Sequence, residues 1–190
     1  MKIIKLSDLH SSLMPSVDIL PDSAIQKTGK PFFIPDFAER FVCRVAVAAH
    51  ICRLGKNIAC KFANRYYDSI GLCFVLEAAD LKDNLLGEGL PVAVATSFDG
   101  SVVLGDSYPV CADGHMTVTL SVDGKELGNW EITSVNDMLD SSIELISRYF
   151  TLKIGDCVIL DFGMGNCELV IGSHLSAVIN GKESVNVKIK

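Results

Sequence analysis

Hydrophobic and polar positions divide the chain into many short apolar segments. Residues 41–51 and 72–79 are almost continuously apolar, as is typical of strands buried on both faces. Residues 117–122 and 126–133 flank Asp123-Gly124, a dipeptide that favours a tight hairpin. Further short strands are expected around residues 157–160, 169–171 and 185–189, and residues 93–109 are expected to form two strands, each followed by a turn. The pattern therefore predicts a domain rich in strands.

Two segments instead carry apolar residues at helical spacing. Asn57 is expected to cap a helix over residues 58–70, and Ser134 a helix over residues 135–149. Residues 80–89 are charged and contain glycine, which favours a loop. Many short strands with two modest helices define the predicted fold class, a β-rich α+β domain.

The length of the chain fits one domain. At 190 residues it can bury a substantial core. Residues 1–30, with Pro15 and Pro21, are expected to form a polar, turn-rich lead-in, and residues 31–190 the domain itself.

Composition excludes several classes of protein. A hydrophobic content of 49% and a mean hydropathy of +0.35 argue against disorder, and the apolar segments are too short for a membrane span. A net charge of −6 argues against nucleic-acid partners. The seven cysteines form no CxxC pair, and no secretion signal precedes them, so we expect reduced thiols, no zinc site and a cytoplasmic location.

A series of short motifs recurs in a characteristic order between residues 31 and 190. They are RVAVAA at 44–49, GKNI at 55–58, GLP at 89–91, SFD at 97–99, LG at 104–105, VDGK at 122–125 and FTLKIGD at 150–156. None is specific alone, but their order and spacing resemble the C-terminal catalytic domain of the fumarylacetoacetate hydrolase family. The resemblance implies a mixed β-roll with a buried, oxygen-lined site, usually in a homodimer.

The same resemblance indicates a degenerate active site. Members of the family hold Mg²⁺, Mn²⁺ or Ca²⁺ with a Glu-x-Glu pair and an Asp, because hard cations need oxygen ligands. The pair falls here on Val42 and Arg44, and the Asp on Glu77. Thr96 stands where the family has a substrate-binding Lys, and the family's catalytic His-Glu pair has no clear counterpart. We therefore expect no cofactor. Mg²⁺ or Mn²⁺ would bind only at a rearranged site, with Glu77 as the remaining ligand.

The candidate residues of the pocket have alternative roles. Arg44 could pair internally with Glu77, bind an anion in place of the metal, or lie at the surface. Lys82 and Asp83 could line the mouth of a pocket, although a solvated loop is the simpler interpretation. Asp99 is expected to form a turn, with a catalytic role as the alternative.

The histidines suggest no catalytic arrangement. His50 ends an apolar segment and is expected to be structural, His10 and His115 fall in predicted loops, and His174 falls in a predicted turn. No Ser-His-Asp or Cys-His set can be assembled from local sequence.

Three functions follow from the resemblance. The first is a diverged, metal-free relative that binds a small organic acid. The second is an active hydrolase, isomerase or decarboxylase acting on a 2-oxo or 1,3-dicarbonyl acid. The third is a structural subunit that pairs with an active paralogue. Fold-level analogy does not choose among them.

Overall fold

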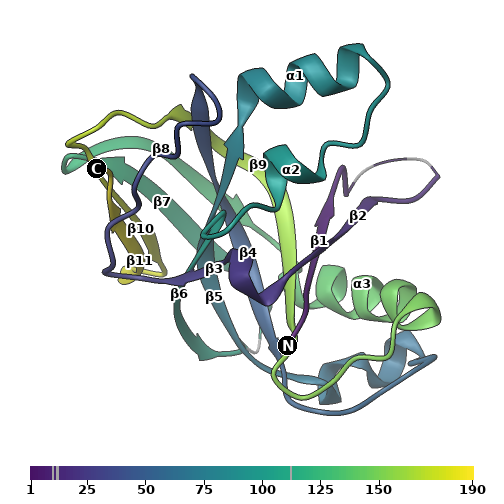
Figure 1. The fold of residues 1–190 in the computed structure, drawn as a ribbon. Coiled ribbons are helices and arrows are strands. Elements are labelled where there is room, and N and C mark those ends of the chain that lie inside the picture. Colours follow the sequence, from purple (N-terminus) through teal and green to yellow (C-terminus); the bar gives the residue numbers. More distant parts are fainter. Residues whose placement is uncertain (10, 12, 112) are drawn as a thin grey trace.

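A computed structural model describes residues 1–190 apart from 10, 12 and 112, so His10 lies outside the described residues. The strand-rich α+β fold that the sequence predicts is confirmed, and Figure 1 shows that its strands form two sheets that pack together. The larger sheet has the strand order β2-β1-β9-β4-β5-β6-β3. Its strands are β1 (Ile3–Ser7), β2 (Ser16–Leu20), β3 (Ile25–Lys27), β4 (Phe41–Ile51), β5 (Tyr67–Ala78), β6 (Val102–Pro109) and β9 (Cys157–Glu168). The pairs β1–β9 and β3–β6 are parallel, so the sheet is mixed.

The smaller sheet is antiparallel and has the order β11-β10-β7-β8. It consists of β7 (Met116–Val122), β8 (Lys125–Ile132), β10 (His174–Ile179) and β11 (Lys182–Lys188). The expected hairpin at Asp123-Gly124 is confirmed, with φ values of 50° and 76°, both in the left-handed region that such two-residue turns require. Residues 169–171 are not a strand, and His174 begins β10 rather than lying in a turn.

Helical segments cover the two ends of the larger sheet. Helices α1 (Ala79–Gly87) and α2 (Ala93–Thr96) lie at one end, and α3 (Val135–Tyr149) lies at the other, beside the 3₁₀ segment η2 (Cys60–Arg65) (Figure 1). A further 3₁₀ turn, η1 (Asp22–Ala24), leads into β3. No helix among the described residues is long and apolar enough to cross a membrane.

Several sequence predictions about the helical segments are wrong. The helix expected over 58–70 is only η2, because Tyr67 already begins strand β5; Asn57 has a φ of 51° and caps no helix. The loop expected over 80–89 is mostly helix α1, in which Ala79 is the only fully buried residue and Leu81 and Leu85 are partly buried against the core. The first strand expected within 93–109 is the single helical turn α2. Helix α3 is confirmed, but the Ser134 side chain makes no capping bond.

The N-terminal segment is part of the sheet. Residues 1–30 supply β1, β2 and β3, and β1 lies between β2 and β9. The expectation that residues 1–30 form a turn-rich lead-in is therefore wrong. The apolar side chains of Ile3, Ile4 and Leu6 are completely buried on the two faces of β1. Their burial fixes this strand in the fold.

Two apolar clusters stabilise the two faces of the larger sheet. The main core combines Val45, Val47 and Phe74 with residues of the smaller sheet such as Leu120 and Leu175, and so fills the space between the sheets. A smaller cluster occupies the opposite face. Its members on the central strands are Ile3, Ala46, Ala48, Cys73, Val75, Cys157 and Ile159. Since side chains alternate along a strand, the next residues of this set also lie on that face.

Candidate functional site

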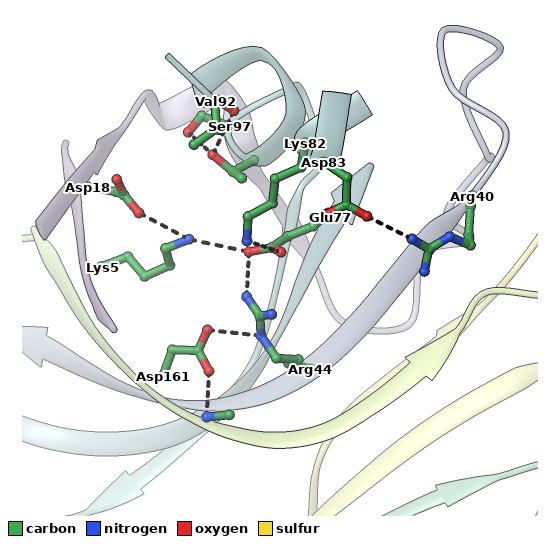
Figure 2. Close-up of polar contacts among 12 residues, drawn as sticks. Lys5, Asp18, Arg40, Arg44, Glu77, Lys82, Asp83, Val92, Ser97 and Asp161 are labelled. Atoms are coloured by element: carbon green, nitrogen blue, oxygen red, sulfur yellow. Dashed lines mark hydrogen bonds and ion pairs between the residues drawn. The ribbon is translucent and has the colours of Figure 1, made fainter. Parts of the chain in front are cut away.

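Charged residues continue the smaller cluster toward one end of the sheet. Lys5, Arg44, Glu77 and Asp161 each lie two positions from a buried member of that cluster, on the adjacent strands β1, β4, β5 and β9. With Asp18 of β2 and Lys82 of α1 they form what we call the charged cluster (Figure 2). The alternation of the strands thus brings five charges from five strands to one place, and helix α1 adds the sixth.

Glu77 is the centre of the charged cluster. Its side chain is only 3% exposed. Arg44 Nη2 donates a hydrogen bond to Glu77 Oε1, and Lys82 Nζ donates to Oε2 at 2.8 Å. Lys5 Nζ lies 3.7 Å from Oε1. Burial alone would raise the pKa of Glu77, but the hydrogen bond from Lys82 and the positive charges of Arg44 and Lys5 outweigh it and hold the pKa below its ordinary value.

Arg44 joins Glu77 to a second carboxylate. Its Nε donates to Asp161 Oδ2 at 3.1 Å, while the other oxygen of Asp161 accepts the Gly163 N–H at 2.9 Å. Partial burial would lower the pKa of Arg44, but the charges of Asp161 and Glu77 raise it, so the guanidinium remains charged. The expected internal pairing of Arg44 with Glu77 is confirmed, and Asp161 is an additional partner.

Lys5 completes the charge balance from the N-terminal hairpin. It faces Asp18 across the β1–β2 ladder, and its Nζ lies 3.3 Å from Asp18 Oδ2. Three cations therefore oppose three carboxylates in the charged cluster. A buried group of charges is tolerated when it is neutral and hydrogen-bonded in this way.

The charged cluster lines a cavity of about 660 Å³. Its wall is of mixed character, with apolar side chains, several hydroxyl groups, the charges described above and the carboxylate of Asp8. The uncharged residues in the wall are Ser7, Leu9, Ser11, Ser16, Leu86, Val92, Thr96, Phe162 and Gly163. A cavity of this size holds a small organic molecule.

The sequence candidates occupy different places around this cavity. Arg44, Glu77, Lys82 and Thr96 line it, and the Thr96 hydroxyl donates to the Val92 carbonyl at 3.3 Å. Lys82 does not lie in a solvated loop: it belongs to α1 and reaches inward to Glu77. Asp83, on the same helix, points instead toward solvent and pairs with Arg40 (Figure 2).

Two further candidates lie elsewhere. Asp99 is exposed in a turn, as expected, and is not among the residues that line the cavity. His50 is exposed too, with its Nδ1 3.1 Å from Asp68 Oδ1, rather than enclosed at the end of its strand. Neither residue contributes to the cavity wall.

Sequence reasoning missed Lys5, Asp18 and Asp161. Lys5 and Asp161 are single charges within otherwise apolar segments, and this pattern is the signal by which the sequence could identify them. Lys5 lies in the segment for which the sequence predicts a polar, turn-rich lead-in. Asp161 lies inside the twelve-residue strand β9, just beyond the short strand expected around residues 157–160.

The charged cluster does not fit a divalent cation. Glu77 uses both carboxylate oxygens on Arg44, Lys5 and Lys82, and Asp161 uses both on Arg44 and Gly163. A hard cation needs oxygens that are not already neutralised, and a guanidinium between the two carboxylates repels it. The described residues also contain no group of three His, Cys, Asp or Glu side chains suited to a metal.

Comparisons with known proteins agree with this architecture. No family model matches the chain. The oxaloacetate tautomerase FAHD1 of Rattus norvegicus is 24% identical over 190 residues, covering 97% of this chain and 86% of that protein. The oxaloacetate tautomerase YcgM of Escherichia coli is 23% identical, covering 88% of this chain and 78% of that protein.

Solved structures share the fold. A fumarylacetoacetate hydrolase family protein from Yersinia pestis superposes with a TM-score of 0.86 at 24% identity, covering 100% of this chain and 92% of that one. The fumarylpyruvate hydrolase of Pseudomonas aeruginosa, solved with Mn²⁺ and pyruvate, gives a TM-score of 0.84 at 18% identity, covering 100% and 89%. At this level of identity the comparisons show that the chain shares the fold of fumarylacetoacetate hydrolase family proteins.

Proposed function

We propose that this protein binds a small organic acid, of the 2-oxo acid class, without a divalent metal. The observation that carries the proposal is Arg44 standing between Glu77 and Asp161 at the wall of the cavity. A resident guanidinium supplies, through hydrogen bonds, a positive charge where the family resemblance places a metal ion.

The cations of the charged cluster retain donors for a ligand. Arg44 donates through Nε and Nη2, and among the described residues Nη1 has no hydrogen-bond acceptor. Lys82 is 28% exposed and uses one N–H on Glu77. These donors face a space lined by Leu9, Val92 and Phe162, which suits the short carbon chain of an organic acid.

Ligand-induced stabilisation in the presence of EDTA tests the proposal. Pyruvate should raise the melting temperature saturably, because a ligand that binds only the folded state stabilises it. The effect should be much weaker in Lys82→Gln and unchanged in Lys61→Gln, whose side chain is exposed outside the cavity. Stabilisation that appears only after Mg²⁺ or Mn²⁺ is added would contradict a metal-free site.

Direct titration with the metal is the second test. Calorimetry with Mn²⁺ should show no saturable site in the protein as purified. A saturable site that is lost in Glu77→Ala would overturn the proposal and favour rearranged ligation of a metal.

Catalysis on a 2-oxo acid is the second candidate function. It is favoured by the oxaloacetate tautomerase of Rattus norvegicus, which matches 97% of this chain. Tautomerisation moves one proton between C3 and the C2 oxygen, so positioned acids and bases are the groups it requires. The decay of the enol absorbance of oxaloacetate, measured in EDTA with and without the protein, tests this activity. An unchanged decay rate would leave binding as the function.

We also propose that the protein is a cytoplasmic homodimer. The family resemblance supports the dimer, and seven free thiols suit a reducing compartment. Light scattering at micromolar concentration should give a mass near twice the 20.5 kDa of the chain. A mass of 20.5 kDa would contradict the dimer.

A further inference from the structure

Two cysteines face each other across the larger sheet, on the face opposite the charged cluster. Cys43 of β4 and Cys167 of β9 are directly opposed in the antiparallel ladder, and both contact the main core. Cys167 Sγ lies 3.7 Å from the carbonyl oxygen of Cys43. The two residues are therefore neighbours in space, although 124 positions separate them on the chain.

The backbone geometry at this pair suits a disulfide. Directly opposed residues of an antiparallel ladder have Cα atoms about 4.5–5.5 Å apart, and disulfides join Cα atoms about 4.4–6.8 Å apart. The Leu169 N–H donates to the Phe41 carbonyl at 2.9 Å, which holds this end of the ladder in register. Because opposed side chains lie on the same face of a sheet, rotation about the Cα–Cβ bonds brings the two sulfur atoms together.

No other cysteine in the described part of the chain has a cysteine opposite it on a neighbouring strand. Cys73 of β5 and Cys157 of β9 share the smaller apolar cluster, but β4 lies between their strands. The remaining three, Cys52, Cys60 and Cys111, lie outside the strands. The sheet therefore selects Cys43 and Cys167 as a pair.

The two thiols differ in their surroundings. Cys167 is partly exposed, whereas Cys43 is completely buried. A hydrogen bond from the Cys43 thiol lowers the pKa of Cys167 below its ordinary value and outweighs the effect of partial burial. An accessible thiol of lowered pKa beside a second cysteine is the arrangement found in redox-sensing proteins. Cys167 is thus the thiol that an oxidant reaches first, and Cys43 is the one that can react with its oxidised form.

We propose that Cys43 and Cys167 form a reversible disulfide on exposure to hydrogen peroxide. The Cys167 thiolate attacks one oxygen of the peroxide, the O–O bond breaks, and the departing hydroxide takes up the proton that Cys167 released. The Cys43 sulfur then attacks the sulfenic sulfur of Cys167, and the S–O bond breaks as hydroxide leaves with the Cys43 proton. The two thiols together lose two electrons, one peroxide becomes two waters, and a dithiol reductant reverses the reaction.

The disulfide would join the two strands at an irregular part of their ladder. The register between β4 and β9 shifts between Cys43 and Val45 and again between Val45 and Val47. Arg44 and Asp161, which pair in the charged cluster, are carried by these same two strands. A crosslink here also closes a long loop of chain, and so it stabilises the folded state relative to the unfolded state.

Counting free thiols with a maleimide tests the proposal. The full chain is reduced, freed of reductant, treated with hydrogen peroxide, then denatured and labelled, and its intact mass gives the number of labels. The chain has seven cysteines, so we expect seven labels before oxidation, five after it and seven again after dithiothreitol. Peptide mapping without reduction should recover Cys43 joined to Cys167. The oxidised protein should also melt at a higher temperature than the reduced protein.

Two substitutions at partly exposed cysteines provide the comparison. Cys167→Ser should keep all six of its remaining thiols after peroxide and show no rise in melting temperature. Cys52→Ser is the matched control and should fall from six labels to four. Circular dichroism first establishes that each variant is folded, and the peptide map of the wild-type chain decides the matter without them.

Three results would overturn the proposal. The first is an unchanged count of seven labels in the oxidised wild-type protein. The second is a crosslink that joins other cysteines, or the loss of two labels in Cys167→Ser. The third is conversion of Cys167 to the sulfinic acid in place of the crosslink, because it would show that Cys43 does not reach the sulfenic sulfur.

Discussion

Two ion-paired regions arise from the same pair of chain segments. Arg40 precedes β4 and pairs with Asp83 of α1, while Arg44 within β4 pairs with Glu77 near the end of β5 (Figure 2). Asp83 is 69% exposed and Glu77 is 3% exposed. The two arginines are four residues apart on the chain, so the difference in exposure between the two ion pairs comes from their surroundings.

Burial changes what such a pair contributes. A solvated ion pair adds little to the stability of the fold, because water already stabilises each charge in the unfolded state. In the charged cluster, every group depends on its partners, because removing one leaves another buried without compensation. The same chemistry is therefore nearly neutral at the surface and critical in the cavity, and the predictions below measure this contrast.

Glu77→Gln should have the largest effect. It removes the carboxylate shared by Arg44, Lys5 and Lys82, and breaking a buried pair costs about 3–5 kcal/mol. Urea unfolding at neutral pH measures the change in the free energy of unfolding. A loss no larger than that of Asp83→Asn would show that the charged cluster is solvated in the folded protein.

Lowering the pH should remove part of the stabilisation that the Glu77 carboxylate provides. The pKa of Glu77 in the folded state lies below its ordinary value of 4.5. A carboxyl group of this kind stabilises the fold above its unfolded pKa and loses that contribution as the pH falls through its folded pKa. The difference in unfolding free energy between the wild-type protein and Glu77→Gln should therefore shrink below about pH 4.5. A difference that grows in acid would contradict the sign of the shift.

Lys82→Gln should have an intermediate effect. It removes one charge-assisted hydrogen bond to Glu77, which still keeps Arg44 and Lys5. Because Lys82 is partly exposed, we expect a loss of about 1–2 kcal/mol in urea unfolding. Lys125→Gln, at an exposed hairpin position, is the matched control and should change stability by less than about 0.5 kcal/mol.

Much of the fold follows from local sequence. The apolar continuity of β4 and β5 and the Asp123-Gly124 turn identify strands directly, because burial and turn geometry are local constraints. Helix α1 was not predicted because its apolar face is limited to Ala79, which is buried, and to the partly buried Leu81 and Leu85, with charged and polar residues between them. Apolar residues at helical spacing predict a helix over residues 58–70, but the segment from Tyr67 onward is part of strand β5. The sheet that holds this strand is formed by tertiary contacts, which override the local preference.

Only part of the charged cluster could be predicted from the sequence, for a similar reason. Arg44 and Glu77 could be paired because the resemblance places both at one position. Asp161 reaches Arg44 because β9 pairs with β4. Lys5 is brought to the same place by the parallel pairing of β1 with β9, which joins residues more than 150 positions apart. No local pattern specifies such a contact, although a charge inside an apolar strand marks each residue as a candidate.

Asp83→Asn should have the smallest effect on stability, and it measures what an exposed ion pair contributes. The Arg40–Asp83 pair is exposed at both partners, and pairs of this kind contribute about 0–1 kcal/mol, so the loss should stay within about 0.5 kcal/mol. Salt sharpens the contrast, because at 1 M ionic strength the screening length falls to about 3 Å for exposed charges but buried pairs are screened much less. The effect of Asp83→Asn should therefore disappear in 1 M NaCl while that of Glu77→Gln persists. Loss of both effects in salt would show that water and ions reach the charged cluster, and the contrast between the two regions would fail.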